Sequence, residues 1–153
     1  MKLDINLDLL DELKEPLPKG TYVLEYVRDD FSNSNTIIDI YCKVLSSPDH
    51  PEKVGAKCKI QTCYSSNNKQ IVAVGNSIRN QIFKACIGKD LFDAESKKGG
   101  LNTSKLYGLK FQCFVDIKET TYGFNTSKNT FKTFKCVYTD EDLLQIAKER
   151  FLD

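Results

Sequence analysis

The strongest constraint on the fold is a change in the spacing of apolar residues along the chain. Between two groups of segments that alternate apolar and polar side chains, Ile71, Val74, Ile78, Ile82 and Cys86 recur at helical intervals of three and four residues. Alternation is typical of strands, and the longer period is typical of a helix. The sequence therefore predicts three strands, one helix and two more strands. The predicted strands are residues 21–28, 36–45, 54–64, 106–119 and 130–138.

The residues between these elements predict where they begin and end. Ser66 or Asn67 can cap the start of the helix, and Gly88 can end it. Gly75 inside the helix costs about 1 kcal/mol relative to alanine, which indicates a close approach of the helix to the sheet. We expect hairpin loops at 29–35 and 120–129, a turn at 46–53 and a mobile polar linker at 89–105.

Both ends of the chain carry shorter signals. Residues 7–14 fit an amphipathic turn of helix ended by the following prolines. Asp140 can cap a final helix over residues 141–152, with one apolar side made by Leu143, Leu144, Ala147 and Phe151.

Three strands, a helix and two strands are the element order of an OB-fold, which is a five-stranded Greek-key barrel. We therefore expect a mainly β protein: an OB-fold-like Greek-key barrel with its helix between strands 3 and 4 and an extra C-terminal helix. An α+β sandwich with the same elements is the alternative. A chain of 153 residues fits a single core.

The charge is segregated along the chain although its net value is only +1. Residues 1–39 hold four Lys/Arg and nine Asp/Glu, residues 40–139 hold sixteen and seven, and residues 140–153 hold two and five. A basic body suits a polyanion, because phosphate neutralisation releases counterions. Lysines on strands also prevent edge-to-edge aggregation, so charge alone leaves both interpretations open.

The residues offer little support for catalysis, a metal or a cofactor. His50 is the single histidine and lies between Asp49 and Pro51, where an exposed, non-catalytic role is expected. Asp29 and Asp30 read as a solvated turn. No glycine-rich loop with a following Lys-Ser/Thr is present, so no cofactor and no catalytic residue is predicted.

The six cysteines are expected to be reduced and buried. Cys58 and Cys63 are the nearest pair to a zinc-ligand spacing, but residues five apart in a strand point to opposite faces. Free cysteine mainly behaves as a small apolar residue. We predict no metal site.

Aromatic residues interleave with lysines on the expected outward strand faces and on one hairpin. Proteins that bind single strands combine bases stacked on aromatic rings with cations along the backbone. Packing in the core or at a subunit interface is the alternative for each aromatic residue. The candidate nucleic-acid-binding residues are Tyr41, Lys43, Lys57, Lys59, Lys110, Phe114, Lys118, Tyr122, Phe124, Lys128, Lys132 and Phe134.

The chain contains three short motifs: Leu17-Pro18-Lys19-Gly20-Thr21-Tyr22, Ala85-Cys86-Ile87-Gly88 and Leu106-Tyr107-Gly108-Leu109-Lys110-Phe111. Together they resemble a known family, the phage-encoded OB-fold single-stranded DNA-binding proteins long catalogued as a domain of unknown function. They resemble that family's Pro-x-Gly-x-Tyr opening, its Ala-x-Gly helix end and its Leu-x-Gly-Lys-x-Phe entry into strand 4. Leu109 stands where the family usually has lysine. The resemblance implies DNA replication, recombination or repair in a virus-infected cell, without catalysis.

The sequence and the resemblance together predict a sequence-tolerant single-stranded DNA-binding protein, with RNA as an alternative ligand. We expect an acidic arm at 1–19, an OB-fold-like nucleic-acid-binding domain at 20–138 and an acidic amphipathic C-terminal helix at 139–153. That helix is a candidate contact for replication or recombination proteins, and a homo-oligomer is a further option. A non-enzymatic protein-interaction module, such as a viral inhibitor or assembly factor, is the competing function.

A metal-dependent nuclease is disfavoured, because the sequence shows no cluster of acidic residues that could hold the metal. No apolar run approaches the ~20 residues that span a bilayer. An acidic residue, Asp4, interrupts the start of the chain too early for a secretory signal. We therefore expect no membrane contact and a location in the cytoplasm, that of the host cell if the protein is viral.

Overall fold

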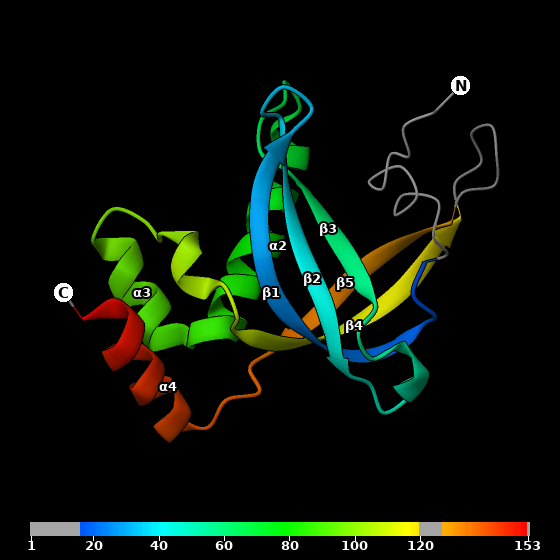
Figure 1. Ribbon diagram of the computed structural model, residues 1–153. Helices are drawn as coiled ribbons and strands as arrows, with labels where there is room; N and C mark the ends of the chain where they lie inside the picture. The colour runs from blue at the N-terminus through cyan, green and yellow to red at the C-terminus, as the bar shows by residue number, and fades with distance from the viewer. Residues whose placement is uncertain (1–15, 120–126, 153) are drawn as a thin grey trace, which may run out of the picture.

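The computed structural model describes residues 16–119 and 127–152, and its centre is one antiparallel sheet of five strands (Figure 1). The strand order is β3-β2-β1-β4-β5. The predicted strand number and sequence order are confirmed, but hydrogen bonds do not close the sheet into a barrel, because β3 and β5 remain its edges. The strands are β1 (Gly20–Ser32), β2 (Ile37–Ser46), β3 (Lys57–Cys63), β4 (Lys110–Glu119) and β5 (Ser127–Lys135).

Strand β1 extends further than the alternation predicts. Asp29 and the next three residues, expected to be loop, belong to the strand, and the turn is confined to residues 33–36. An irregularity between Tyr26 and Arg28 shifts the register with β2, so the period-two pattern is interrupted there. Asp29 is not a solvated turn residue: it accepts hydrogen bonds from the hydroxyls of Tyr26 (2.5 Å) and Tyr107 (2.9 Å).

Helix α2 (Lys69–Ile87) lies between β3 and β4, as predicted. Asn68, not Ser66 or Asn67, caps it by accepting hydrogen bonds from two backbone amides, and Gly88 ends it with a φ of 84°. The expected close approach at Gly75 is confirmed, since a Cβ added there would lie 2.1 Å from the carbonyl oxygen of Cys63. The helix therefore packs directly on the end of β3.

The predicted mobile linker at 89–105 is wrong. The segment forms α3 (Lys89–Lys97) and a 3-10 turn, η2 (Thr103–Leu106). Leu91 and Phe92 are partly buried against the core, and Glu95 is buried as well. The segment is strongly polar, so the sequence did not indicate a helix. Leu91 and Phe92 are nevertheless enough to hold α3 against α2 and the core.

The C-terminal segment forms α4 (Asp140–Ile146), followed by a π-helical turn, η3 (Ala147–Phe151). Thr139 rather than Asp140 is the cap, in a capping box with Asp142. Ile146 and Phe151 are buried, whereas Leu144, which was predicted on the apolar side, is 63% exposed. These two apolar residues, together with Arg150, which donates to the carbonyl oxygens of Lys105 and Tyr107, hold the segment against the domain.

The core lies between the sheet and α2. Tyr22, Leu24 and Tyr26 from β1 are fully buried, and β2 and β4 contribute side chains on the same face of the sheet. The other core residues are Leu17, Ile40, Cys42, Val44, Ile60, Ile82, Ala85, Cys86, Ile87, Leu106, Leu109, Phe111, Cys113, Val115, Ile146 and Phe151.

Within the described ranges, no helix has the length and apolar character needed to cross a membrane.

Candidate nucleic-acid interface

The two faces of the sheet differ in character. The inner face carries the buried residues that contact α2; the opposite side, here called the outer face, carries most of the strands' charged residues. Basic side chains outnumber acidic ones there, because the strand registers bring lysines from four strands to one side. The basic residues are Arg28, Lys43, Lys57, Lys59, Lys110, Lys118, Lys128, Lys132 and Lys135; the acidic ones are Glu25, Asp30, Asp39 and Asp116.

Lys43 and Lys57 lie directly opposite each other on β2 and β3 and are both exposed. The amide of Tyr64 donates to the carbonyl of Thr36, and the amide of Val44 donates to the carbonyl of Ala56. Even-numbered residues of β2 therefore occupy hydrogen-bonded pairs with the β3 side of the sheet. The odd-numbered Lys43 is therefore at a non-hydrogen-bonded pair, where opposing side chains are closest. Like charges at such a position destabilise a sheet, so an anion that binds both ammonium groups relieves the repulsion.

Beside this pair, Arg28 covers the ring of Tyr41. The guanidinium carbon lies 3.8 Å from the ring centroid, within the range of a cation–π contact. Lys59 is opposite Tyr41 on β3 and is half-buried. The ring of Tyr41 is therefore covered on one side, and the exposed, planar guanidinium group of Arg28 faces solvent in its place. We call Arg28, Tyr41, Lys43, Lys57 and Lys59 the β2–β3 patch.

A second cation–aromatic cluster lies on β4 and β5. The half-buried ring of Phe114 has the ammonium groups of Lys132 and Lys19 at 5.3 and 6.0 Å from its centroid. Phe114 faces outward, as predicted. Lys132 also lies 3.7 Å from a carboxylate oxygen of Asp116. We call these four residues the β4–β5 patch.

The pKa of Asp116 is lowered from its usual value. The main cause is a hydrogen bond from the backbone amide of Ile117, and the positive charges of Lys19 and Lys132 act in the same direction. The carboxylate is therefore ionised at neutral pH and orients Lys132 next to the ring of Phe114.

The remaining predicted lysines also lie on the outer face. Lys118 and Lys128 are exposed and directly opposite each other, a second pair of like charges. Lys110 is exposed, with its ammonium group 5.6 Å from the ring centroid of Tyr138. Two of the predicted residues, Tyr122 and Phe124, lie outside the described part of the chain.

Phe134 does not face outward, and the expectation for its orientation is wrong. Thr133 has a positive φ of 56° and coincides with a register shift in β5, which returns Phe134 to the same side as Phe131. The ring of Phe134 contacts buried Phe111 at a centroid distance of 6.1 Å. Simple alternation cannot reveal such a bulge.

Sequence reasoning also missed exposed aromatic and basic residues. Arg28 and Lys19 were outside the candidate set, although each contacts a candidate ring. Phe31 and Tyr64, which are 47% and 49% exposed, form an edge-to-face pair at 5.2 Å near the ends of β1 and β3. The assignment of Phe31 to a loop concealed this pair.

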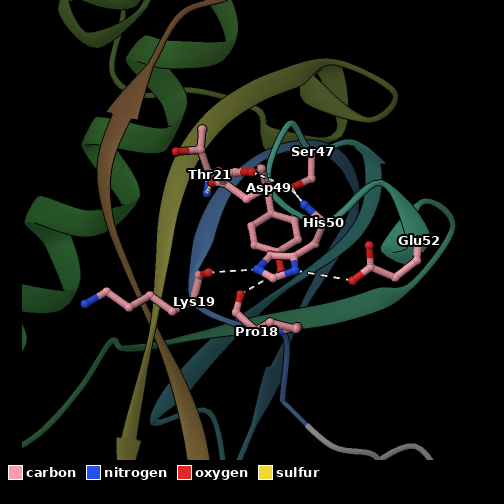
Figure 2. Close-up of polar contacts among 8 residues, drawn as sticks. Pro18, Lys19, Thr21, Ser47, Asp49, His50 and Glu52 are labelled. Atoms are coloured by element: carbon pink, nitrogen blue, oxygen red, sulfur yellow. Dashed lines mark hydrogen bonds and ion pairs between the residues drawn. The ribbon is translucent and has the colours of Figure 1, made fainter.

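His50 ties a loop to the start of β1, as Figure 2 shows. Its Nε2 lies 2.9 Å from the carbonyl oxygen of Lys19, and its Nδ1 lies 3.3 Å from a carboxylate oxygen of Glu52. The ring also stacks on Tyr22. Burial raises the pKa of Tyr22 to about 12. The histidine is half-buried rather than exposed, and both ring nitrogens have structural partners.

In the same loop, side chains replace a strand partner for Thr21 (Figure 2). Its amide donates to Asp49 Oδ2 (2.8 Å), and its carbonyl accepts from Ser47 Oγ (2.7 Å). The hydroxyl of Ser47 also accepts the amide hydrogen of His50 at 3.0 Å. The loop therefore closes the edge of β1 where β2 has ended.

The six cysteines are free, but only Cys42, Cys86 and Cys113 are fully buried; Cys136 is exposed. Burial raises the pKa of the Cys86 and Cys113 thiols above the usual range. Among residues 16–119 and 127–152, no three histidine, cysteine or acidic side chains gather in a way that could hold a metal ion.

Comparison with known proteins adds no relative. No protein-family model matches the chain, and no curated protein is similar to it at a significant level.

Proposed function

We propose that the protein is a non-enzymatic, sequence-tolerant single-stranded DNA-binding protein that acts in viral or phage DNA replication, recombination or repair. The observation that carries the proposal is the composition of the outer face. Lys43 and Lys57 repel each other at close range, and on either side of β1 a cation lies against an aromatic ring. Phosphates relieve the first feature, and unpaired bases stack on the second.

The fold supports the same proposal. We propose that the open sheet is an OB-fold whose barrel is incomplete between β3 and β5. OB-folds are partly open Greek-key barrels that bind oligonucleotides on the face of strands 2 and 3 and with the adjoining loops. The β2–β3 patch lies on those two strands and on neighbouring β1.

Fluorescence anisotropy with labelled oligo(dT), a matched duplex and an RNA strand, each measured over a salt series, tests the proposal. We expect tighter binding of the single strand than of the duplex, with an affinity that falls steeply as salt rises. The RNA arm shows whether the protein discriminates between the two sugars. Absence of binding to every nucleic acid at low salt would refute the proposed function.

A protein-interaction module is the second candidate, and a separate surface favours it. A groove of about 370 Å³ lies between β3 and α2; its lining includes Ile71, Val74 and Ile78 from α2 and residues 61–63 of β3. Ile71 and Val74 are 49% and 59% exposed. Exposed apolar groups that gather in this way are typical of protein contacts. Substituting both exposed residues with serine leaves oligonucleotide affinity unchanged if the outer face carries the function.

A further inference from the structure

Strand β3 has a neighbouring strand on only one of its two edges in the described part of the chain. Its even-numbered residues pair with the even-numbered residues of β2, which occupy the hydrogen-bonded positions of that ladder. In an antiparallel ladder the residues between such positions direct their amide and carbonyl groups to the other side. The backbone groups of Lys59 and Gln61 therefore point toward the open edge, where a further strand can pair with them.

The apolar groove between β3 and α2 lies beside this open edge. Residues 61–63 of β3 form one wall, and Ile71, Val74 and Ile78 of α2 are part of the other. Ile71 and Val74 are both about half exposed. An extended segment bound to a strand edge pairs through its backbone and places alternate side chains in such a groove. The groove and the edge together thus suit a strand rather than a helix.

The surroundings of the edge indicate the charge of that strand. On the outer face the edge carries exposed Lys57 and half-buried Lys59. Helix α2, over its whole length from Lys69 to Ile87, contains three basic residues and no acidic one. A complementary strand therefore has apolar side chains toward α2 and acidic side chains toward the two lysines.

The N-terminal part of this chain contains a segment with that pattern. In residues 3–8, Leu3-Asp4-Ile5-Asn6-Leu7-Asp8, every second residue is apolar, and two of the three residues between them are aspartates. In an extended chain the two sets lie on opposite faces. Residues 1–15, which include the helical turn predicted at 7–14, lie outside the described part of the chain.

The described chain begins close enough to β3 for this segment to reach the edge. Val23 of β1 pairs with Ser46, and Lys57 of β3 pairs with Lys43, so β1 and β3 both begin at the end of the sheet where β2 finishes. Adjacent strands are about 4.8 Å apart, which puts a strand added beyond β3 roughly 15 Å from β1. Residues 9–16 span up to roughly 26 Å when extended, so they can bridge this distance.

We propose that residues 3–8 bind the open edge of β3 in the same molecule, as a sixth strand antiparallel to β3. The direction follows from the connection, since Asp8 arrives at the Lys57 end and Leu3 reaches the groove. The three apolar side chains then cover the exposed apolar groups of α2. The two aspartates lie along Lys57 and Lys59 and offset their charge.

Amide hydrogen exchange, followed by NMR on the full chain without nucleic acid, tests this docking. In the wild type the amides of Lys59 and Gln61 exchange at least about tenfold more slowly than in the double variant Ile5→Asp/Leu7→Asp, the factor for a segment docked in about nine-tenths of the molecules. The amide of Ile60, which is directed toward β2, exchanges at the same rate in both proteins. Equal rates for Lys59 and Gln61 in the two proteins would overturn the docking.

Val74→Asp tests the same contact from the groove. Its carboxylate replaces an exposed apolar contact and repels the acidic segment, so Lys59 and Gln61 lose their slow exchange. Ala73→Asp is the matched control, because it places the same charge on an exposed neighbour outside the groove lining, and it keeps the slow exchange. Equal loss in both variants overturns the assignment of the groove. Slow exchange that grows with protein concentration, together with a dimer in sedimentation, overturns docking within one molecule in favour of a second copy.

Discussion

Lys57→Glu is predicted to stabilise the protein and to weaken its DNA binding. The substitution turns the Lys43–Lys57 repulsion into an attraction between opposite charges on adjacent strands. Such a change across a strand pair is worth about 0.5–1 kcal/mol, which raises the unfolding temperature of a domain of this size by about 1–4 °C. Thermal unfolding followed by circular dichroism at low salt measures this gain.

The effect on DNA has the opposite sign. One lost phosphate contact lowers the slope of log affinity against log salt by about 0.7 for a single strand, which corresponds to about fivefold at 0.1 M salt. Lys69→Glu makes the same charge change at the first residue of α2, where an acidic side chain stabilises a helix by about 0.3–1 kcal/mol. This control is also stabilised but keeps its affinity. Equal weakening by both variants, or destabilisation by Lys57→Glu, contradicts the reasoning.

Three further predictions follow from other contacts. Phe114→Ala lowers single-strand affinity, measured by anisotropy, by about 1–3 kcal/mol at a nearly unchanged unfolding temperature, because the Phe114 ring faces outward. Phe134→Ala mainly lowers the unfolding temperature, because the Phe134 ring packs on buried Phe111. Gly75→Ala destabilises by about 1–3 kcal/mol in urea unfolding, because its Cβ meets a β3 carbonyl at 2.1 Å. For Asp116, whose pKa is lowered in the fold, the stability gained over Asp116→Asn is full above about pH 4 and is lost as pH falls through the lowered pKa; a gap in urea midpoints that widens on acidification contradicts this.

The sequence predicted the elements whose apolar spacing is regular. The five strands, the helix that contains Gly75 and the C-terminal helix all follow from local periodicity, which depends on few residues at a time. The short helix α3 was missed because Leu91 and Phe92 are its main anchors among polar residues. The expected barrel is not closed by hydrogen bonds between the described strands, because pairing between β3 and β5 is non-local and no local pattern specifies it.

The outer face was predicted in part. Lysines on regular strands were placed correctly, because side-chain direction follows directly from alternation. Phe134 was misplaced by the bulge at Thr133, and Arg28 was missed because the irregularity before it shifts the register with β2. Contacts such as Arg28 on Tyr41 join residues distant in the chain and depend on registers that no local pattern specifies.

The loop that closes the edge of β1 has a consequence for how this protein can vary. A strand paired through its backbone tolerates most substitutions in its partner, because every residue except proline offers the same amide and carbonyl. At Thr21 these groups are instead bound by the side chains of Asp49 and Ser47. Because two particular side chains supply these hydrogen bonds in place of a strand backbone, related proteins should vary less at buried Ser47 and exposed Asp49 than at the neighbouring exposed lysines.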